Sequence, residues 1–351
     1  MSTSPASITK MTHRFLGDSG LLVSKLALGG WMIDDPSFTA SAWYKMMQLA
    51  FEHGVNFFDT AEAYMSGKGE SLMGEAIKEG IADGIWSRED LVISTKIFWG
   101  FKDVFDCGPN DQGLSRKHLV EGTKRSLARL QLEYVDVIFC HRPEPFTPIE
   151  ETVRAMNFII NQGWALYWGT SEWPAADIIK ACDIADRLGL IRPIVEQTQY
   201  NMVERSKVEF EYKYKLGLTT FSPLAYGLLT GKYSAGVKPE GSRFQEKPEL
   251  GFLYPDFDNL AAKADQLKTV AEGVGCSLAQ LALAWCVSND NVSTVLVGAK
   301  RPDQLRENLD AIALVEKITP EVKKQIDDIV RFTPTLSTEY NFLCTLRSKH
   351  L

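Results

Sequence analysis

The chain has 351 residues, 45% of them apolar and 24% charged, which is enough to bury a large core as one α/β barrel or as two ordinary domains. Its formal net charge is −7 and no face is dense in Lys and Arg, which argues against non-specific binding to nucleic acid or to a membrane surface. The six cysteines form no Cys-x-x-Cys pair, no apolar run approaches the length of a membrane span, and residues 1–10 lack a signal-peptide core. We therefore expect a cytoplasmic protein with reduced cysteines.

Residues 1–11 are small and polar, and they are predicted to form a flexible leader. Two short apolar runs, 14–16 and 21–24, then flank a Gly-Asp-Ser-Gly turn, which is typical of a β-hairpin. From there on, strand-like runs alternate with amphipathic helical patterns. The predicted strands begin at Leu26, Val55, Leu91, Val135, Ala165, Ile194, Thr219 and Val292. The predicted helices cover 39–53, 70–82, a segment capped by Ser115, 148–162, 174–189, 259–273, 278–288, 302–313 and 319–330.

Eight strand–helix units without a break in composition predict a single (β/α)₈ TIM barrel over 12–330, followed by a C-terminal tail at 331–351. The alternative, an open doubly wound sheet, lacks its Gly-x-Gly-x-x-Gly signal. Two long connections, 97–114 and 223–258, follow strands. They are therefore predicted at the carboxyl-end rim of the barrel, where substrate pockets and lids are usually built.

Three apolar runs lead into Asp59, Lys96 and His141, and Tyr64 lies in the loop after the first of them. Because parallel strands end at one rim, these side chains are predicted to meet there. A charged lysine stabilises phenolate, and a carboxylate behind the lysine keeps it charged. We therefore predict that Tyr64 is a general acid with a lowered pKa, tuned by Lys96 and Asp59, and that His141 orients a substrate oxygen.

Acid catalysis on a carbonyl needs an electron source, and hydride from a nicotinamide is the predicted one. Barrels bind phosphate at the loops after their seventh and eighth strands, here 222–232 and 298–302. Basic side chains in or near these loops favour the 2′-phosphate of NADPH; they are Lys232, Arg243, Lys300 and Arg301. The five histidines are scattered without metal-ligand spacing, so no metal is expected.

These motifs resemble the aldo-keto reductase family over nearly the whole chain. Asp59-Thr60-Ala61-Glu62-Ala63-Tyr64, followed by Gly67 and Glu70, matches the family's first signature, and Lys96 and His141 supply the remaining tetrad positions. Longer strings are most similar to the voltage-gated potassium-channel β subunits and their fungal and plant relatives. These strings are 96–100, 113–118, 130–136 and 167–171.

The resemblance implies NADPH-dependent reduction of a small aldehyde or ketone, and a homo-oligomer, a tetramer as in the channel subunits. It implies a substrate pocket lined by Trp31, Phe98 and Trp99. The cofactor contacts that it implies fall on Trp31, Asp59, Ser171, Gln197, Phe221, Ser222, Pro223, Leu224, Gly227, Lys232, Arg243, Gly298, Lys300, Gln304, Glu307 and Asn308.

The sequence also departs from the family pattern. His141 stands where the animal channel subunits have Asn, and Glu172 replaces an Arg beside the nicotinamide amide. The connection 200–219 is shortened, so a reduced sixth helix is expected, and 101–112 carries a small insertion in the substrate loop. Two alternatives stay open: a regulatory channel β-subunit-like protein with weak reductase activity, and a Schiff-base aldolase or lyase that uses Lys96 as nucleophile.

Overall fold

The structure is a computed structural model, and it describes residues 11–32, 38–102, 106–212 and 216–335. The predicted leader therefore lies almost entirely outside the described residues. Most of the predicted tail also lies outside them, because the description stops at Thr335.

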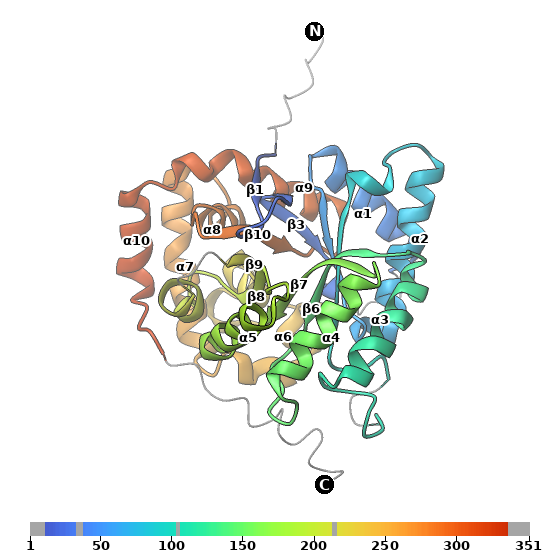
Figure 1. Cartoon of the computed structure of the whole chain (residues 1–351). Coiled ribbons are helices and arrows are strands. Elements are labelled where there is room, and N and C mark those ends of the chain that lie inside the picture. Colours follow the sequence, from blue (N-terminus) through green and yellow to red (C-terminus); the bar gives the residue numbers. More distant parts are fainter. Residues whose placement is uncertain (1–10, 33–37, 103–105, 213–215, 336–351) are drawn as a thin grey trace.

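Eight parallel strands close into a barrel, which confirms the predicted TIM-barrel fold (Figure 1). Around the barrel each strand pairs with the next, and the last pairs with the first through Leu26 and Val295. The strands are β3 (Leu26–Gly29), β4 (Phe57–Asp59), β5 (Val92–Ile97), β6 (Val135–Cys140), β7 (Ala165–Ser171), β8 (Val195–Gln199), β9 (Gly217–Phe221) and β10 (Val292–Val297).

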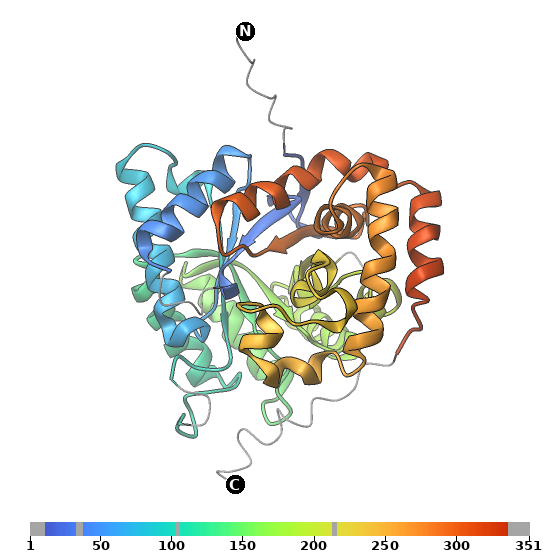
Figure 2. The same cartoon turned by 180° about the vertical axis from the view of Figure 1, so that it is seen from behind.

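The helices pack around the outside of the barrel, from α1 and α2 on one side to α7 and α10 on the other (Figures 1 and 2). Ser115 caps α3 as predicted, since its hydroxyl accepts from the His118 N–H. The helices are α1 (Ala40–Glu52), α2 (Lys68–Ala82), α3 (Arg116–Leu130), α4 (Ile149–Asn161), α5 (Ala175–Leu188), α6 (Arg243–Glu246), α7 (Phe257–Val274), α8 (Leu278–Val287), α9 (Pro302–Asp310) and α10 (Pro320–Val330). Between β8 and β9 the described residues contain only a π-helical turn, Lys207–Glu211, so the predicted reduction of the sixth helix is confirmed.

The predicted hairpin covers the amino end of the barrel. Its strands β1 (His13–Phe15) and β2 (Leu22–Ser24) are antiparallel. Leu16 and Val23 from the hairpin pack with inward-facing barrel residues such as Phe57 and Val137. In the turn, Gly17 has φ +60°, and a Cβ there would lie 2.4 Å from the Gly217 nitrogen at the start of β9. Only glycine fits this close approach of two backbones.

The alternation of side chains along the strands explains why the polar residues gather at the other end. Phe57 on β4 and Val92 on β5 are paired and face inward, and two residues later Asp59 is paired with Ser94. Successive side chains of a strand point to opposite faces, so Asp59, Ser94 and Lys96 share the inward face with the apolar residues below them. The barrel interior is therefore apolar at its amino end and polar at its carboxyl end.

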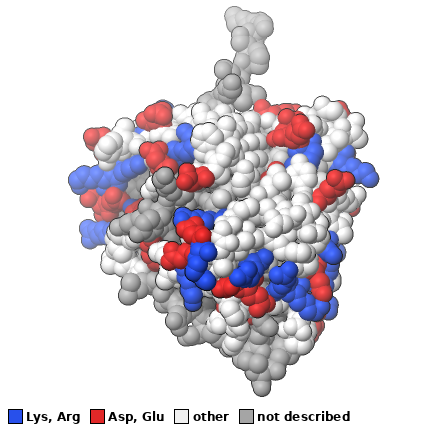
Figure 3. Space-filling view, viewed as in Figure 1, with Lys and Arg blue, Asp and Glu red and all other residues white. Residues whose placement is uncertain are grey.

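The surface carries both signs of charge. On the face seen in Figure 3, acidic and basic side chains are interspersed. In the described part of the chain, no single helix is long and apolar enough to cross a membrane, although α7 and α8, bent by 80° at their junction, pass the length and composition test as a pair.

Candidate active site

Four predicted residues come together at the carboxyl end of the barrel. Lys96 Nζ pairs with the Asp59 carboxylate and lies 3.2 Å from the Tyr64 hydroxyl. The ammonium also donates to the Thr60 carbonyl at 2.8 Å. His141 packs beside this chain of contacts, with its ring centroid 5.9 Å from that of Tyr64. A phenol, an ammonium–carboxylate pair and an imidazole therefore lie together at this end of the barrel.

Two further hydrogen bonds fix the Asp59 carboxylate in this position. Its Oδ1 accepts from the Ser94 hydroxyl at 2.6 Å and from the Gln197 amide at 3.2 Å. Lys96 is fully buried and is already paired with Asp59. This arrangement does not fit a Schiff-base nucleophile, which must be reachable by substrate and deprotonated.

Burial raises the pKa of Tyr64 above its usual value of 10.0, against the opposing effect of Lys96. Our prediction of a lowered pKa is therefore wrong for the protein without ligands. The reason is that burial disfavours the phenolate more than Lys96 favours it, and Asp59, which keeps Lys96 charged, adds to the effect of burial. Lys96 stays an ammonium: burial favours the neutral amine, but Asp59 and Tyr64 raise its pKa. At neutral pH, Tyr64 is thus a protonated phenol beside a cation.

His141 is neutral in this environment. Burial, reinforced by the positive charges of Arg142 and Lys96, holds the pKa of His141 well below 6.5. Its Nδ1 is buried and has no hydrogen-bond partner among the described residues. A neutral imidazole beside two cations can hydrogen-bond a substrate oxygen and orient it, but it does not readily take up a proton.

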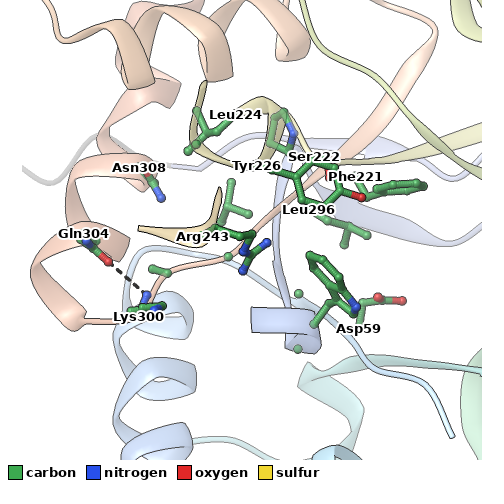
Figure 4. Close-up of a pocket in the computed structure, with 18 of the residues that line it drawn as sticks. Asp59, Phe221, Ser222, Leu224, Tyr226, Arg243, Leu296, Lys300, Gln304 and Asn308 are labelled. Atoms are coloured by element: carbon green, nitrogen blue, oxygen red, sulfur yellow. Dashed lines mark hydrogen bonds between the residues drawn. The ribbon is translucent and has the colours of Figure 1, made fainter. Parts of the chain in front are cut away.

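The tetrad lies at one end of a cavity of about 780 Å³, within the usual range for ligand sites. The cavity extends along the carboxyl-end rim to the start of α9 (Figure 4). Its lining includes every predicted cofactor residue: Trp31, Asp59, Ser171, Gln197, Phe221, Ser222, Pro223, Leu224, Gly227, Lys232, Arg243, Gly298, Lys300, Gln304, Glu307 and Asn308.

Positive charge is concentrated at the far end of this cavity. The pKa of Lys232 is lowered by burial and further by the positive charges of Arg243 and Lys300, while Glu246, which pairs with Lys300 at 3.3 Å, raises it. The backbone N–H of Lys300 donates to Gln304 Oε1 at 3.1 Å, at the beginning of α9 (Figure 4). Crowded cations beside a helix N-terminus suit phosphate groups.

The middle of the cavity is bordered by two aromatic rings. Trp31 and Tyr226 meet edge to face, with ring centroids 5.5 Å apart. The Arg243 guanidinium lies 4.6 Å from the Trp31 ring centroid and 5.8 Å from that of Tyr226. These contacts join the loop after β3 to the 223–258 connection across the cavity.

The sequence of this chain matches that of a known protein family. The sequence model of the Aldo/keto reductase family matches residues 25–331. The chain belongs to the aldo/keto reductase family. Members of this family are typically NAD(P)-dependent oxidoreductases.

Two plant proteins are similar to this aldo/keto reductase over their full length. Both are named "Probable voltage-gated potassium channel subunit beta". The one from Arabidopsis thaliana is 49% identical over 337 residues, covering 94% of this chain and 100% of its own. The one from Oryza sativa subsp. japonica is 47% identical over 336 residues, with the same coverage of both chains.

Two predicted residues of this aldo/keto reductase lie apart from the cavity lining. Phe98, expected in the substrate pocket, is 3% exposed and packs in the core between barrel and helices, while its neighbour Trp99 lines the cavity. Lys96 lies behind the lining and reaches the cavity through Tyr64. Glu172, which replaces the family's Arg beside the nicotinamide amide, also lies apart from the lining: it pairs with Lys207 at 2.7 Å and accepts from the Gln199 N–H.

One carboxylate oxygen accepts several hydrogen bonds at the start of the loop that carries Trp99. Glu62 Oε1 accepts from the backbone N–H groups of Phe98 and Gly100 at 2.8 and 2.9 Å, and it lies 3.0 Å from His118 Nε2. Burial favours the neutral acid, but His118 and these N–H groups hold the pKa of Glu62 below its usual value. The buried Glu62 carboxylate therefore positions the start of the 97–114 connection.

The structure adds lining residues that we did not predict. Arg142 follows His141 directly, which was a usable signal, because the residue after a strand end also faces the rim. Tyr226 lies in the predicted phosphate loop, whereas Ser277 and Ala279 at the start of α8 gave no sequence signal. In the described residues, no group of three or more His, Cys, Asp or Glu side chains is arranged to hold a metal ion.

Proposed function

We propose that this protein reduces an aldehyde or ketone to an alcohol with NADPH, and that Tyr64 is the proton donor. The observation that carries the proposal is the hydrogen-bonded series from Asp59 through Lys96 to Tyr64 at one end of a cavity whose other end is rich in positive charge. A reductase needs a proton source and a site for an anionic dinucleotide.

The cavity residues fit NADPH on chemical grounds. The charges of Arg243 and Lys300 disfavour the charged form of Lys232, and a phosphate group beside Lys232 would relieve that repulsion. They and the start of α9 would hold the phosphate groups, and Ser171 and Gln197 would hold the nicotinamide end near Tyr64. When bound, NADPH supplies the hydride that the protein's own side chains lack.

The protein's side chains manage the proton. The Tyr64 hydroxyl donates its proton to the carbonyl oxygen as that oxygen gains negative charge, and the alcohol is formed. Lys96, at 3.2 Å from the tyrosine oxygen, stabilises the phenolate left behind until solvent returns a proton. Neutral His141 orients the carbonyl oxygen toward Tyr64.

The variant Tyr64→Phe tests this role. We expect kcat for an aldehyde to fall about 10²- to 10⁴-fold, because the acid is lost. The NADPH dissociation constant, measured by fluorescence quenching, should stay nearly unchanged. Tyr44→Phe is the matched control, since that tyrosine bonds Asp83 on the surface. Full activity of Tyr64→Phe, or equal loss of activity and NADPH affinity, would contradict the proposal.

A second function is favoured by the printed names of the two plant relatives. In that proposal the barrel binds NADPH and docks a voltage-gated potassium channel, with weak reductase activity. Co-purification with a coexpressed channel subunit tests it. The docking role would be favoured if Tyr64→Phe still binds the channel subunit and if the unaltered protein shows absent or negligible turnover of aldehydes.

The remaining proposals concern place and assembly. We propose that the protein is cytoplasmic, because the five described cysteines are all free. We also propose a homotetramer, by similarity to the channel β subunits. Light scattering coupled to size-exclusion chromatography tests the tetramer, and a monomer would contradict it.

A further inference from the structure

Arg142 brings a positive charge to the catalytic end of the cavity. It directly follows His141 at the end of β6, and its side chain lines the cavity together with Tyr64 and Trp99. Its Nη1 donates to two neutral acceptors, the His141 carbonyl at 2.5 Å and the Ser171 hydroxyl at 3.2 Å. Among the described residues, no carboxylate lies within ion-pair distance of this guanidinium.

The nearby carboxylates are already neutralised by lysines. Asp59 pairs with Lys96, and Glu172 pairs with Lys207 at 2.7 Å. Because each of these pairs sums to zero, Arg142 leaves the catalytic end with a net positive charge. The Arg142 charge acts on two neighbouring groups. It lowers the pKa of Tyr64 against the larger, opposite effect of burial, and it lowers the pKa of His141 in addition to the larger effect of burial.

The rest of the guanidinium remains open to a ligand. Nε and Nη2 have no hydrogen-bond partner in the described part of the chain, and neither is sealed away from solvent. A guanidinium presents its N–H groups in a planar fork that matches the two oxygens of a carboxylate. The two hydrogen bonds on Nη1 hold this fork in a defined place, which lowers the entropy lost on binding.

The surroundings of Arg142 complete a site for a small organic acid. Trp31, Trp99 and Tyr226 line the same cavity and offer apolar surface for the body of a substrate. Ser171, which accepts from Arg142, is one of the residues proposed above for the nicotinamide end, so the guanidinium would lie beside the place where a substrate meets the nicotinamide. The site therefore combines a proton donor, an apolar wall and one anion-binding group.

We propose that Arg142 binds a carboxylate of the substrate, so that the preferred substrates are aldehydes and ketones that also carry a carboxylic acid. This inference rests on the proposed reductase function and names its substrate class. Arg142 recognises the acid, and Tyr64 acts on the carbonyl.

A pair of aldehydes of the same shape tests the proposal. 4-Carboxybenzaldehyde carries the charge, and methyl 4-formylbenzoate is its neutral ester. We expect kcat/KM to favour the acid about 10-fold or more in the unaltered protein, as for a charge-assisted hydrogen bond. In Arg142→Met this preference should disappear, and Arg142→Lys should restore part of it. Absence of a preference in the unaltered protein, or its persistence in Arg142→Met, overturns the proposal.

A binding measurement separates failure of this inference from failure of the reductase function. Calorimetry with 4-methylbenzoate, and with 4-methylbenzamide as the neutral control, needs no turnover and is run with and without NADP⁺. We expect the benzoate to bind the unaltered protein about 10-fold more tightly than Arg142→Met. If neither aldehyde is reduced but this difference is found, the reductase function fails and the carboxylate site stands. Equal binding to both proteins, or no binding to either, overturns the site.

Discussion

At the scale of single residues, the protonation state of Tyr64 depends on whether burial or the Lys96 charge has the larger effect on its pKa. Sequence reasoning weighed the Lys96 charge and predicted a more acidic phenol, but it could not weigh the removal of water from the hydroxyl. Burial is the larger effect, and Asp59 adds to it. Tyr64 is therefore present as phenol throughout the neutral range, and in the proposed reaction the contribution of Lys96 is to stabilise the phenolate as it forms.

The pH dependence of reduction follows from this. We expect kcat/KM to stay nearly level from about pH 6 to about pH 9, and to fall only above pH 10 as the raised pKa of Tyr64 is approached and the phenol is lost. His141 should add no step in this range, since its pKa lies well below 6.5 and it remains neutral. A pH series of aldehyde reduction measures this. A midpoint near pH 7 to 8 would support the lowered pKa instead.

The sequence predicted which residues form the site better than it predicted where their side chains point. Asp59, Lys96 and His141 could be placed because each follows an apolar run, and period-two alternation brings them to one face. Beyond the end of a strand that rule no longer holds. Phe98 and Trp99 are adjacent aromatics, and the hydrogen bonds that fix this loop, to Glu62 and within the loop from Gln112 and Gly113, could not be predicted from the sequence.

At the scale of elements, the strands and longer helices were predictable, and the short turns around the site were not. Apolar periodicity places α1, α4 and α10 within one residue of their observed bounds. The turn after β4 has no such period: Met65 and Ser66 both have φ +53°, which is stabilised by surrounding contacts and not by local preference. The same holds for the 3₁₀ segments and the four-residue α6 in the 223–258 connection.

The contact between α3 and the substrate loop makes a further prediction. In His118→Phe the Glu62 carboxylate loses a buried partner, so the loop should loosen and the protein should be destabilised by about 3 kcal/mol. We expect a higher KM for the aldehyde and faster proteolysis within 97–114, with NADPH affinity little changed. His53→Phe is the control, because His53 is also buried but bonds only the Leu49 carbonyl within α1. An unchanged KM in His118→Phe would show that Glu62 holds the loop without help.

At the scale of the whole molecule, the hairpin closes the end of the barrel that is opposite the site. Arg14 is its main polar anchor: Nη1 donates to the carbonyls of Val287, Asn289 and Val292 at 3.0, 3.0 and 2.6 Å. These carbonyls lie at the end of α8, in the turn that follows it and at the start of β10. The anchor therefore joins the first strands of the chain to the last one.

Replacing this anchor should affect stability and leave the site intact. Arg14→Met should lower the free energy of unfolding by about 1–3 kcal/mol, because several carbonyls lose their donor. NADPH affinity should not change, since the hairpin lies at the amino end of the strands. Urea denaturation and fluorescence quenching measure the two quantities. Arg192→Met removes an exposed pair with Asp186 and should cost less than about 1 kcal/mol. Equal effects of both variants would mean that the hairpin contributes little.

The crowding of Lys232, Arg243 and Lys300 has a practical consequence for work with this protein. The charges of Arg243 and Lys300 act on Lys232, so a small anion such as the phosphate or sulfate of common buffers is expected to bind beside Lys232. In the proposed cofactor site, such ions would compete with the phosphate groups of NADPH and weaken its apparent affinity. The choice of buffer anion therefore becomes part of any comparison of coenzyme preference.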